Sequence, residues 1–255
     1  MKRVTAFVAS ARRRHTYNSV LRFLDAVQSL GEVDSEIVVL SDYDLKTCRG
    51  CKACCDRGEE LCPFQDDRDV LLDKMMASDG VVFASPVYSF QVSAIMKIFL
   101  DRLGFAFHRP RFFGKTFTSI VVEAIYGGPK TVEYLDFVGD ALGFNVVKGS
   151  CVNSLEPMPE KQRRTNERIL ASHGRVFHDR LSRPSLPAPT LLHLMMFRMG
   201  RTKIRLMLDE TWSDYRYYRH QGWFEADYFY PVRLNPIKKA AGHLFDYSAA
   251  RSLKK

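Results

Sequence analysis

Short continuous apolar runs recur along the first 182 residues, and a polar turn follows each of them. Runs of this length, rich in Val, Ile and Phe, are typical of buried strands. The five segments with this pattern are Val4–Ala9, Glu36–Leu40, Gly80–Ala84, Thr116–Ala124 and Phe144–Val152. Because such strands are not alternating but apolar throughout, they predict a parallel sheet that is covered on both faces.

Segments with helical periodicity separate these strands. Between Thr16 and Leu30, for example, Val20, Phe23, Leu24 and Val27 fall on one helical face. The segments read as helices are Thr16–Leu30, Arg68–Ala77, Gln91–Phe107, Thr131–Leu142 (ended by Gly143) and Pro159–Leu181. Strands that alternate with helices through right-handed crossovers predict an α/β fold, a doubly wound sandwich.

The character of the chain changes at residue 183. The proline-rich segment RPSLPAP reads as a linker, so we expect a core domain of residues 1–182 and an extension of residues 183–255. The extension is predicted to be mostly helical, with two amphipathic segments broken at Gly200 and a last helix over Pro236–Phe245. Its methionines and aromatic residues are expected to form a core, and its expected role is to cover the first domain or to meet a partner subunit.

Composition narrows the class of protein. A hydrophobic fraction of 46% and a charged fraction of 26% are typical of a soluble globular chain. No apolar run reaches the roughly 18 residues of a membrane span, and the apolar part of the N-terminus is too short for a signal peptide. The sequence therefore predicts a cytoplasmic protein without a transmembrane segment.

Positive charge is concentrated in the extension. The net charge is +9, and residues 183–255 hold 13 Lys and Arg against 6 Asp and Glu, a surplus of 7. Nucleic acid, an anionic membrane surface or a phosphorylated ligand would suit such a surface. A solvated face explains the charge as well, and we expect no specific nucleic-acid partner.

Five of the six cysteines lie within fifteen residues, which favours metal or redox chemistry in a reducing compartment over a disulfide framework. Cys48, Cys51, Cys54 and Cys62 form the pattern C-x2-C-x2-C-x7-C, followed by Pro63. Four thiolates on a short loop can bind a [4Fe–4S] cluster or zinc, and unligated thiols are a third reading. Cys55 falls outside the spacing, and Cys151 is expected to be a small buried apolar residue.

Three turns follow predicted strands and offer complementary chemistry: turn one (Ser10–Asn18), turn two (Ser85–Phe90) and turn three (Ala124–Gly128). In an open parallel sheet, ligands bind beyond the carboxyl ends of the strands. Turn one combines hydroxyls, arginines and a helix start, which suits a phosphate. Turn two offers aromatic surfaces, and the two glycines of turn three allow the backbone to approach a ligand closely. No dinucleotide or P-loop glycine pattern is present.

Four segments carry a family resemblance, namely SARRRHT, CRGCKACC with GEELCPFQDD, SPVYSFQVSAIMKIFLDR, and IYGG. Together they resemble the flavodoxin-like NAD(P)H-dependent FMN reductase family, and the cysteine loop is similar to that of its iron–sulfur flavoprotein branch. The resemblance covers residues 2–182. It implies a flavodoxin-like five-stranded sheet and favours the [4Fe–4S] reading of the cysteines.

The resemblance also implies a noncovalently bound FMN, with its phosphate at turn one and its ring at turns two and three. The residues implied to contact it are Ser10, Arg12, His15, Thr16, Asn18, Ser85, Pro86, Val87, Tyr88, Ser89, Ala124, Tyr126, Gly127 and Gly128. Relatives of this kind pair as homodimers or homotetramers, with the flavin near a subunit boundary.

The implied activity is hydride transfer from NADPH or NADH to FMN, and then reduction of a quinone, a nitro or azo compound, a free flavin or a redox protein. Because the cofactor carries this chemistry, no side chain is assigned as general acid or base. Asp66, Asp67, Asp101 and Arg102 are expected to cap or pair helices. The alternatives are a non-enzymatic electron carrier between protein partners and a binding module without flavin.

Overall fold

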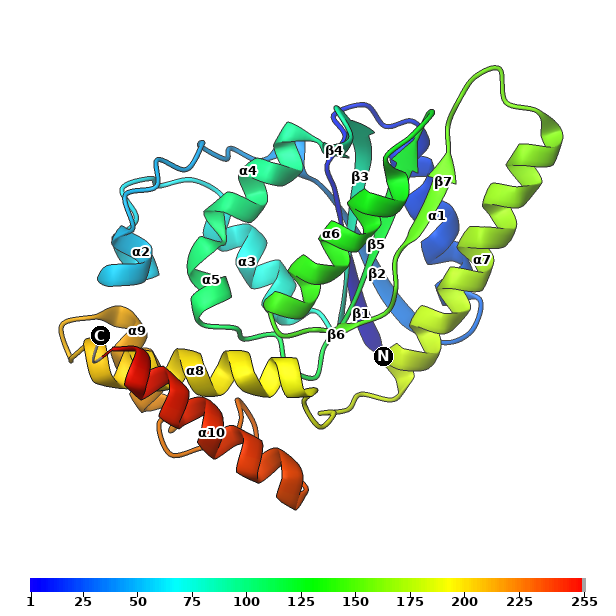
Figure 1. Ribbon diagram of the computed structural model, residues 1–255. Helices are drawn as coiled ribbons and strands as arrows, with labels where there is room; N and C mark the ends of the chain where they lie inside the picture. The colour runs from blue at the N-terminus through cyan, green and yellow to red at the C-terminus, as the bar shows by residue number, and fades with distance from the viewer. Residues whose placement is uncertain (254–255) are drawn as a thin grey trace. The chain divides into compact units, whose positions relative to one another are not determined.

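The computed structural model describes residues 1–253, and its chain divides into two compact units (Figure 1). The first unit contains Met1–Arg49 and Phe64–Pro184. The second contains Gly50–Pro63 together with the chain from Ser185 onward. Most of the cysteine loop therefore belongs to the second unit, although in sequence it interrupts the first.

The first unit is built on a parallel sheet with strand order β2-β1-β3-β5-β6, and β7 also pairs with β5. The strands are β1 (Lys2–Val8), β2 (Val33–Val39), β3 (Gly80–Tyr88), β4 (Gln91–Val92), β5 (Thr116–Glu123), β6 (Asn145–Val146) and β7 (Ser150–Asn153). All pairs are parallel except β3 with β4. Since β6 and β7 both occupy the position beside β5, the sheet has the five parallel positions that the sequence predicts, and the predicted fold class is confirmed.

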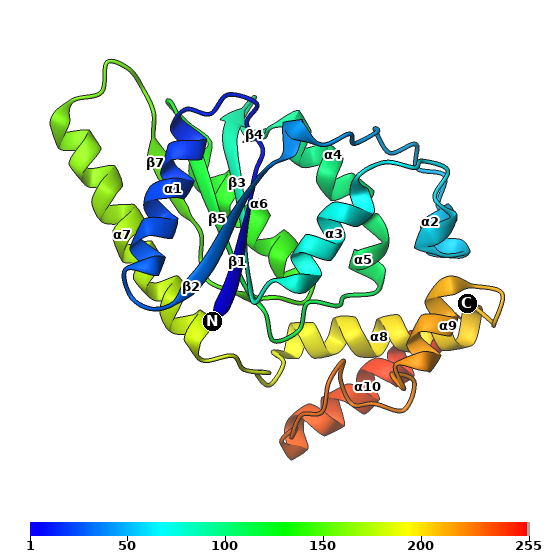
Figure 2. The same cartoon turned by 180° about the vertical axis from the view of Figure 1, so that it is seen from behind.

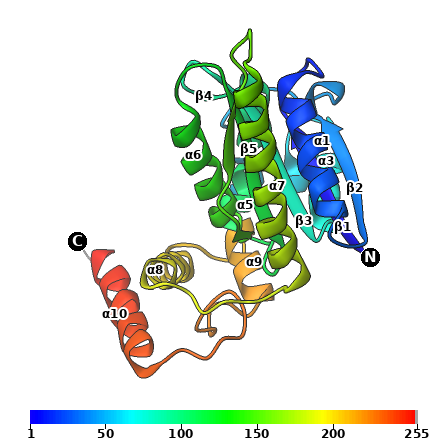
Figure 3. The same cartoon turned by 90° about the vertical axis from the view of Figure 1, so that its right-hand side faces the viewer.

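Residues that alternate along the strands build two different layers of core. Val4, Ala6 and Val8 of β1 pack with α1 (His15–Gln28) and α7 (Glu160–Ser182). Figures 2 and 3 show these two helices side by side on one face of the sheet, and Figure 3 shows α6 on the other. The opposite core is aromatic and includes Phe7, Phe83, Phe99 and Phe117.

The helix predicted for Gln91–Phe107 is wrong at its start, and the structure divides it at Leu103. Gln91 and Val92 form β4, which folds back on β3 as a hairpin, and α4 (Ala94–Arg102) begins only after Ser93. The Ser93 side chain accepts a hydrogen bond from the Met96 N–H and caps that helix. A separate short helix, α5 (Gly104–His108), follows.

The strand predicted for Phe144–Val152 is also interrupted. It divides into β6 and β7, and between them the Gly149 N–H turns away to the Asp136 carboxylate. The other helices of this unit are α3 (Arg68–Ala77), α6 (Gly128–Ala141) and the 3-10 turn η1 (Leu40–Asp42). Gly143 follows the end of α6 with φ +99°, which confirms its predicted role in ending the helix.

The second unit is helical. Its elements are α2 (Ala53–Asp56), η2 (Glu59–Leu61), α8 (Leu191–Met207), α9 (Ser213–His220) and α10 (Pro236–Ser252). The predicted break at Gly200 is wrong, because α8 runs through it; one helical glycine costs only about 1 kcal/mol. The last helix continues past Phe245 to Ser252. Among residues 1–253, no helix has the length and apolarity needed to cross a membrane.

Aromatic rings and buried ion pairs hold the second unit together. Phe197 contacts Trp223 and Tyr228, which confirms that the aromatic residues form a core. Arg198 is almost fully buried, and Asp246 of α10 accepts from both Arg198 and Arg201 of α8. Part of the positive charge of the extension is therefore internal and not a solvated face.

Candidate functional site

Turns one, two and three leave the sheet at one edge. The strands β1, β3 and β5 are adjacent and parallel, with Val8 opposite Ala84 and Pro86 opposite Val122. The Ala9 N–H donates to the Ala84 carbonyl (2.8 Å), which ties the start of turn one to the third strand. The candidate residues on these turns are thus gathered at the carboxyl edge of the sheet, where α/β proteins bind ligands.

Turn one ends at a helix N-terminus that the protein does not cap. Helix α1 begins at His15, and its N-cap residue Arg14 makes no side-chain capping bond. Within residues 1–253, the first amides of this helix, His15 to Tyr17, have no hydrogen-bond acceptor. These donors and the positive end of the helix dipole are what an anion requires.

The arginines of turn one differ in their partners. Arg13 forms an ion pair with Asp42 (3.0 Å) at the end of β2. In the described part of the chain, neither Arg12 nor Arg14 pairs with a carboxylate, and both are exposed. Arg12 is therefore available to a phosphate, whereas Arg13 is occupied.

The remaining polar candidates of turn one have different surroundings. Ser10 is buried and its hydroxyl donates to the Arg12 carbonyl (3.0 Å), so it shapes the turn. Thr16 is buried in the first turn of α1, and Asn18, two residues further along, is exposed. His15 lies with its Nε2 3.8 Å from Glu156. The sequence did not indicate Asp42 or Glu156, because both follow other strands.

Turn two is a tight hairpin between β3 and β4. Tyr88 pairs with Gln91, and the two residues between them, Ser89 (φ +49°) and Phe90 (φ +64°), both adopt left-handed conformations. Two-residue hairpins of this kind usually contain Asn or Gly, so Ser and Phe are strained there. The hairpin leaves Phe90 69% exposed and Tyr88 half-exposed at the sheet edge.

Below the hairpin, Ser85 fixes the turn from within. It is fully buried, its hydroxyl donates to the Pro86 carbonyl (2.9 Å), and its oxygen accepts from the Ser93 N–H (2.9 Å). The Ser93 hydroxyl in turn donates to the Ala9 carbonyl (2.8 Å) of turn one. Ser85 and Ser93 therefore link turns one and two, and the Ser85 side chain is not directed to a ligand.

Turn three packs against turn two. Gly127 has φ +104°, and a Cβ there would lie 3.2 Å from the Phe90 Cα, so a side chain would separate the two turns. The Tyr126 ring lies edge-on to that of Phe90, with the ring centroids 6.0 Å apart. Glu123, at the end of β5, accepts a hydrogen bond from the Gly128 N–H (2.7 Å). This carboxylate was not foreseen, although an acidic residue just before a helix start is a typical capping signal.

These observations fit a phosphorylated planar ligand. Uncapped amides and a free cation lie in turn one, and exposed aromatic rings and a glycine that permits close approach lie in turns two and three. Val87 and Ala124 border the two ring-side turns, and Ala124 is exposed. An FMN would find its phosphate site and its ring site among the residues that the sequence indicated.

Asp66, Asp67 and Asp101 all have partners within the protein, as expected. The Asp66–Arg102 ion pair (2.8 Å) is buried on both sides. Asp101 pairs with Lys97 along α4, and Asp67 precedes α3 and accepts from the Asp44 N–H (2.7 Å). These contacts confirm a structural role.

The cysteines do not form a preassembled metal site. Cys48 and Cys51 are exposed, and Cys54, Cys55 and Cys62 are half-buried. Cys54 and Cys55 lie on α2 with their sulfur atoms 4.0 Å apart. Across residues 1–253, no three His, Cys, Asp or Glu side chains are arranged to hold a metal ion. The four-cysteine site stays a prediction that rests on its donor set.

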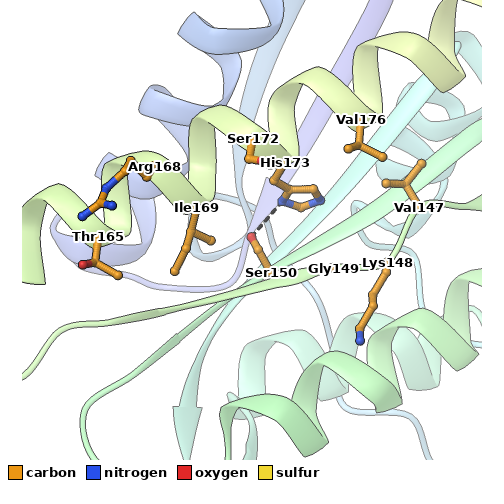
Figure 4. A pocket seen from close by; sticks show the side chains of 10 residues that line it. All are labelled: Val147, Lys148, Gly149, Ser150, Thr165, Arg168, Ile169, Ser172, His173 and Val176. Atoms are coloured by element: carbon orange, nitrogen blue, oxygen red, sulfur yellow. Dashed lines mark hydrogen bonds between the residues drawn. The ribbon is translucent and has the colours of Figure 1, made fainter.

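A pocket of about 600 Å³ lies elsewhere in the first unit, between α7 and the segment that joins β6 to β7 (Figure 4). None of the predicted cofactor residues lines it. Its buried His173 bonds to Ser150 through Nδ1 (2.7 Å) and to Thr118 through Nε2 (2.6 Å). Burial lowers the pKa of His173 to about 4. Since Thr118 donates to the Val147 carbonyl, it accepts from Nε2–H, and Ser150 donates to Nδ1. This network ties α7 to β5 and β7.

The fold defines a flavodoxin-like α/β protein, whose three candidate turns lie at the carboxyl edge of its sheet. The chain belongs to the NADPH-dependent FMN reductase family, whose model matches residues 2–156.

Sequence relatives agree with this placement. An iron–sulfur flavoprotein of Archaeoglobus fulgidus is 38% identical over 148 residues, which cover 52% of this chain and 66% of that protein. Another, from Methanocaldococcus jannaschii, is 38% identical over 87 residues, which cover 33% of this chain and 44% of that protein. The chain thus spans about half to two thirds of the length of these relatives.

A solved structure shares the fold over a longer stretch. RosB, crystallised with the bound intermediate 8-demethyl-8-formylriboflavin-5′-phosphate, superposes with a TM-score of 0.56 at 13% identity. The match covers 92% of each chain. At this identity the similarity shows a common fold, and the site of this chain must be argued from its own residues.

Proposed function

We propose that this chain is an FMN-dependent NAD(P)H oxidoreductase whose cofactor lies at turns one, two and three. The observation that carries the proposal is the uncapped N-terminus of α1 beside the unpaired Arg12, at the same sheet edge as the exposed aromatic turns. The FMN reductase family supports it, as do the relatives described as iron–sulfur flavoproteins.

Each turn has a defined task in this proposal. The α1 amides and Arg12 hold the phosphate, with Thr16 and Asn18 close to it in sequence. Tyr88 and Tyr126 border the ring, Pro86 to Ser89 fix its edge, and the backbone at Gly127 approaches it closely. The bound flavin supplies the hydride and electron-transfer chemistry, and the protein supplies position and electrostatics.

The phosphate and the ring can be tested separately. The purified protein should be yellow, and apo-protein should bind FMN at least about 100-fold more tightly than riboflavin, which lacks the phosphate. Equal affinities for the two would place the phosphate away from turn one. Steady-state oxidation of NADPH or NADH with a quinone or azo acceptor tests the activity itself.

Tyr88→Ala tests the ring position. Loss of an aromatic contact should weaken FMN binding about tenfold, since a base–aromatic stack contributes about 1–3 kcal/mol. Tyr88→Phe keeps the ring and is the matched control, and its affinity should match that of the wild type. Titration of apo-protein by the quenching of flavin fluorescence measures both. An unchanged dissociation constant in Tyr88→Ala would move the ring elsewhere.

The second candidate function is electron transfer between proteins, and the cysteine loop favours it. Cys48, Cys51, Cys54 and Cys62 supply four thiolates, the donor set of a [4Fe–4S] cluster. Zinc would use the same donors. Glycine at Gly50 (φ +64°) and Gly58 (φ +146°) permits the left-handed backbone conformations of this loop.

Cys51→Ala distinguishes the cluster from the flavin site. In protein purified without oxygen, the variant should lose any brown chromophore, with its iron and sulfide, and keep FMN, because the two sites use different turns. Cys55→Ala, outside the ligand spacing, is the control and should keep both. Loss of FMN together with the cluster would show that they form one site.

The proposal also covers the electron acceptor, the cellular compartment and the oligomeric state. The acceptor class includes quinones, nitro and azo compounds, free flavin and redox proteins. The cysteine-rich loop suits a reducing, cytoplasmic compartment. The exposed rings of Phe90 and Tyr126 suit burial against a second subunit, and residues 183–255 would serve as a lid or a dimer arm.

A further inference from the structure

The last residue of β5, Glu123, turns its side chain back onto the start of α6. Its Oε2 accepts the Gly128 N–H at 2.7 Å. Cys151 of β7 lies beside the same carboxylate, since its sulfur and Glu123 Oε2 both lie close to Gly128. Because Cys151 pairs with Val121 and Asn153 with Glu123, residues 123 and 151 are diagonal neighbours on one face of the sheet. One carboxylate therefore joins a strand end, a helix start and the neighbouring strand.

This junction has no spare room. A Cβ on Gly128 would lie 2.2 Å from the Cys151 sulfur and 2.7 Å from the Glu123 Oε2. Burial, and after it the charge of Glu123, raises the pKa of Cys151 to about 12. The thiol is therefore protonated at neutral pH.

The backbone of turn three is held at the same end. The Glu123 carbonyl accepts from the Ser154 N–H (2.7 Å), and the Ala124 carbonyl accepts from the Asn153 side-chain amide (2.9 Å). Between these anchors, Ile125 and Tyr126 are 82% and 71% exposed. The Gly128 N–H already has an acceptor, so the amides that remain for a flavin are those of the residues before it.

We propose that Glu123 is a positioning residue for the flavin ring: it fixes turn three through the Gly128 N–H and places one negative charge beside the ring. The inference rests on the proposed function, because it requires the ring to lie at turn three. Reduction adds electrons to the ring, and a nearby carboxylate in a partly buried site opposes that addition. Glu123 thereby lowers the midpoint potential of the bound flavin.

Three variants separate position from charge. Glu123→Gln keeps an oxygen that can accept from Gly128 and removes the charge. Glu123→Ala removes both. Glu133→Gln is the matched control, because Glu133 is exposed on α6, the helix whose first amide Glu123 binds, and forms an ion pair with Lys130 on the surface. For each, FMN affinity of the apo-protein, the midpoint potential of the bound flavin and amide hydrogen exchange at Gly128 without flavin are measured.

Glu123→Ala should speed exchange at Gly128 and weaken FMN binding about tenfold, as expected for the loss of one charge-assisted hydrogen bond. Glu123→Gln should bind FMN within about threefold of the wild type and shift the potential to a more positive value. Glu133→Gln should change neither. An unshifted potential in Glu123→Gln, or unchanged exchange and affinity in Glu123→Ala, would overturn the proposal.

If the proposed function itself is wrong, the binding measurements give a different result. A wild-type chain that binds no FMN would refute both the flavin site and the effect of Glu123 on it. If FMN binds but both Glu123 variants retain wild-type affinity and potential, only the inference on Glu123 fails.

Discussion

Helices α1 and α6 both begin at the carboxyl edge of the same sheet, and their N-termini are occupied in opposite ways. The first amides of α1 have no recorded acceptor within the described chain, and exposed arginines lie beside them. The first amide of α6 donates to the protein's own Glu123. Because both dipole ends attract negative charge, the start of α1 is the one that can still accept an anion, in line with the proposed phosphate site.

In the proposed function, the same contrast explains how the two ends of an FMN would be placed. An open, cationic helix start suits a phosphate, whereas a start already holding a carboxylate repels one and suits the uncharged part of a ring. A sequence pattern alone does not distinguish these starts, since each is a polar turn between a strand and a helix. The distinction depends on the Glu123 side chain, which accepts a hydrogen bond from the amide of Gly128, five residues further along the chain.

Filling the open helix start should have the largest effect. Arg14→Asp would cap α1 as Glu123 caps α6, and its charge would repel the phosphate, so FMN affinity should fall about 100-fold or more. Arg14→Asn also loses the cation and caps the helix but adds no negative charge, so its affinity should fall far less. Fluorescence titration of the apo-proteins compares them. Similar losses in both variants would contradict a phosphate at this end.

In contrast to the open start of α1, the buried His173 has a protein partner for each of its two ring nitrogens. Its pKa is lowered to about 4 in the folded chain, from about 6.5 when unfolded. Below pH 6.5 the unfolded state therefore binds the proton more readily, and stability should fall as pH falls towards 4. The loss should be about 2.5 kcal/mol at pH 4.5 relative to pH 7.

Urea unfolding at several pH values measures this slope. His173→Gln keeps hydrogen-bonding atoms but cannot titrate. The difference between the pH dependences of the two unfolding free energies therefore reports on the histidine and not on carboxylates that titrate in the same pH range. Equal slopes for the two proteins would show that His173 is protonated alike in both states.

Disturbing the closed helix start should have a smaller effect. Gly128→Ala places a Cβ against the Cys151 sulfur and the Glu123 carboxylate, and overpacking of this kind costs about 1–3 kcal/mol. Adding Cys151→Ala should recover part of the loss. Gly200→Ala is the control, because no atom lies within 4 Å of its new Cβ in α8, and it should stabilise by about 0.5–1 kcal/mol. If Gly128→Ala unfolds at the same urea concentration as the wild type, the side chains around Gly128 can rearrange at little cost in stability.

The sequence predicted the sheet and the three turns because both depend on local patterns. Apolar runs marked β1, β3 and β5, and parallel strands bring their ends to one edge. It did not predict the hairpin at Ser89 and Phe90, since neither residue type favours a left-handed backbone. The hydrogen bond from the Gly128 N–H to Glu123 was missed because Glu123 falls within the segment that was assigned to a strand, Thr116–Ala124.

Errors in the helices have a similar origin. Gly200 suggested a break, but the packing of α8 against α10 outweighs the intrinsic cost of one glycine. Gln91 and Val92 were assigned to a helix because their apolar spacing continues into α4, whereas pairing with β3 decides their conformation. In both cases a tertiary contact outweighed a local preference.

The cysteine segment has a consequence for how this chain is made. Residues 50–63 pack with α9, where Arg216 donates to the Arg57 carbonyl (2.6 Å). During synthesis the thiols leave the ribosome long before the helix that supports them, so this loop stays unsupported until α9 has emerged. Any cofactor that needs the packed loop would be inserted only after that point.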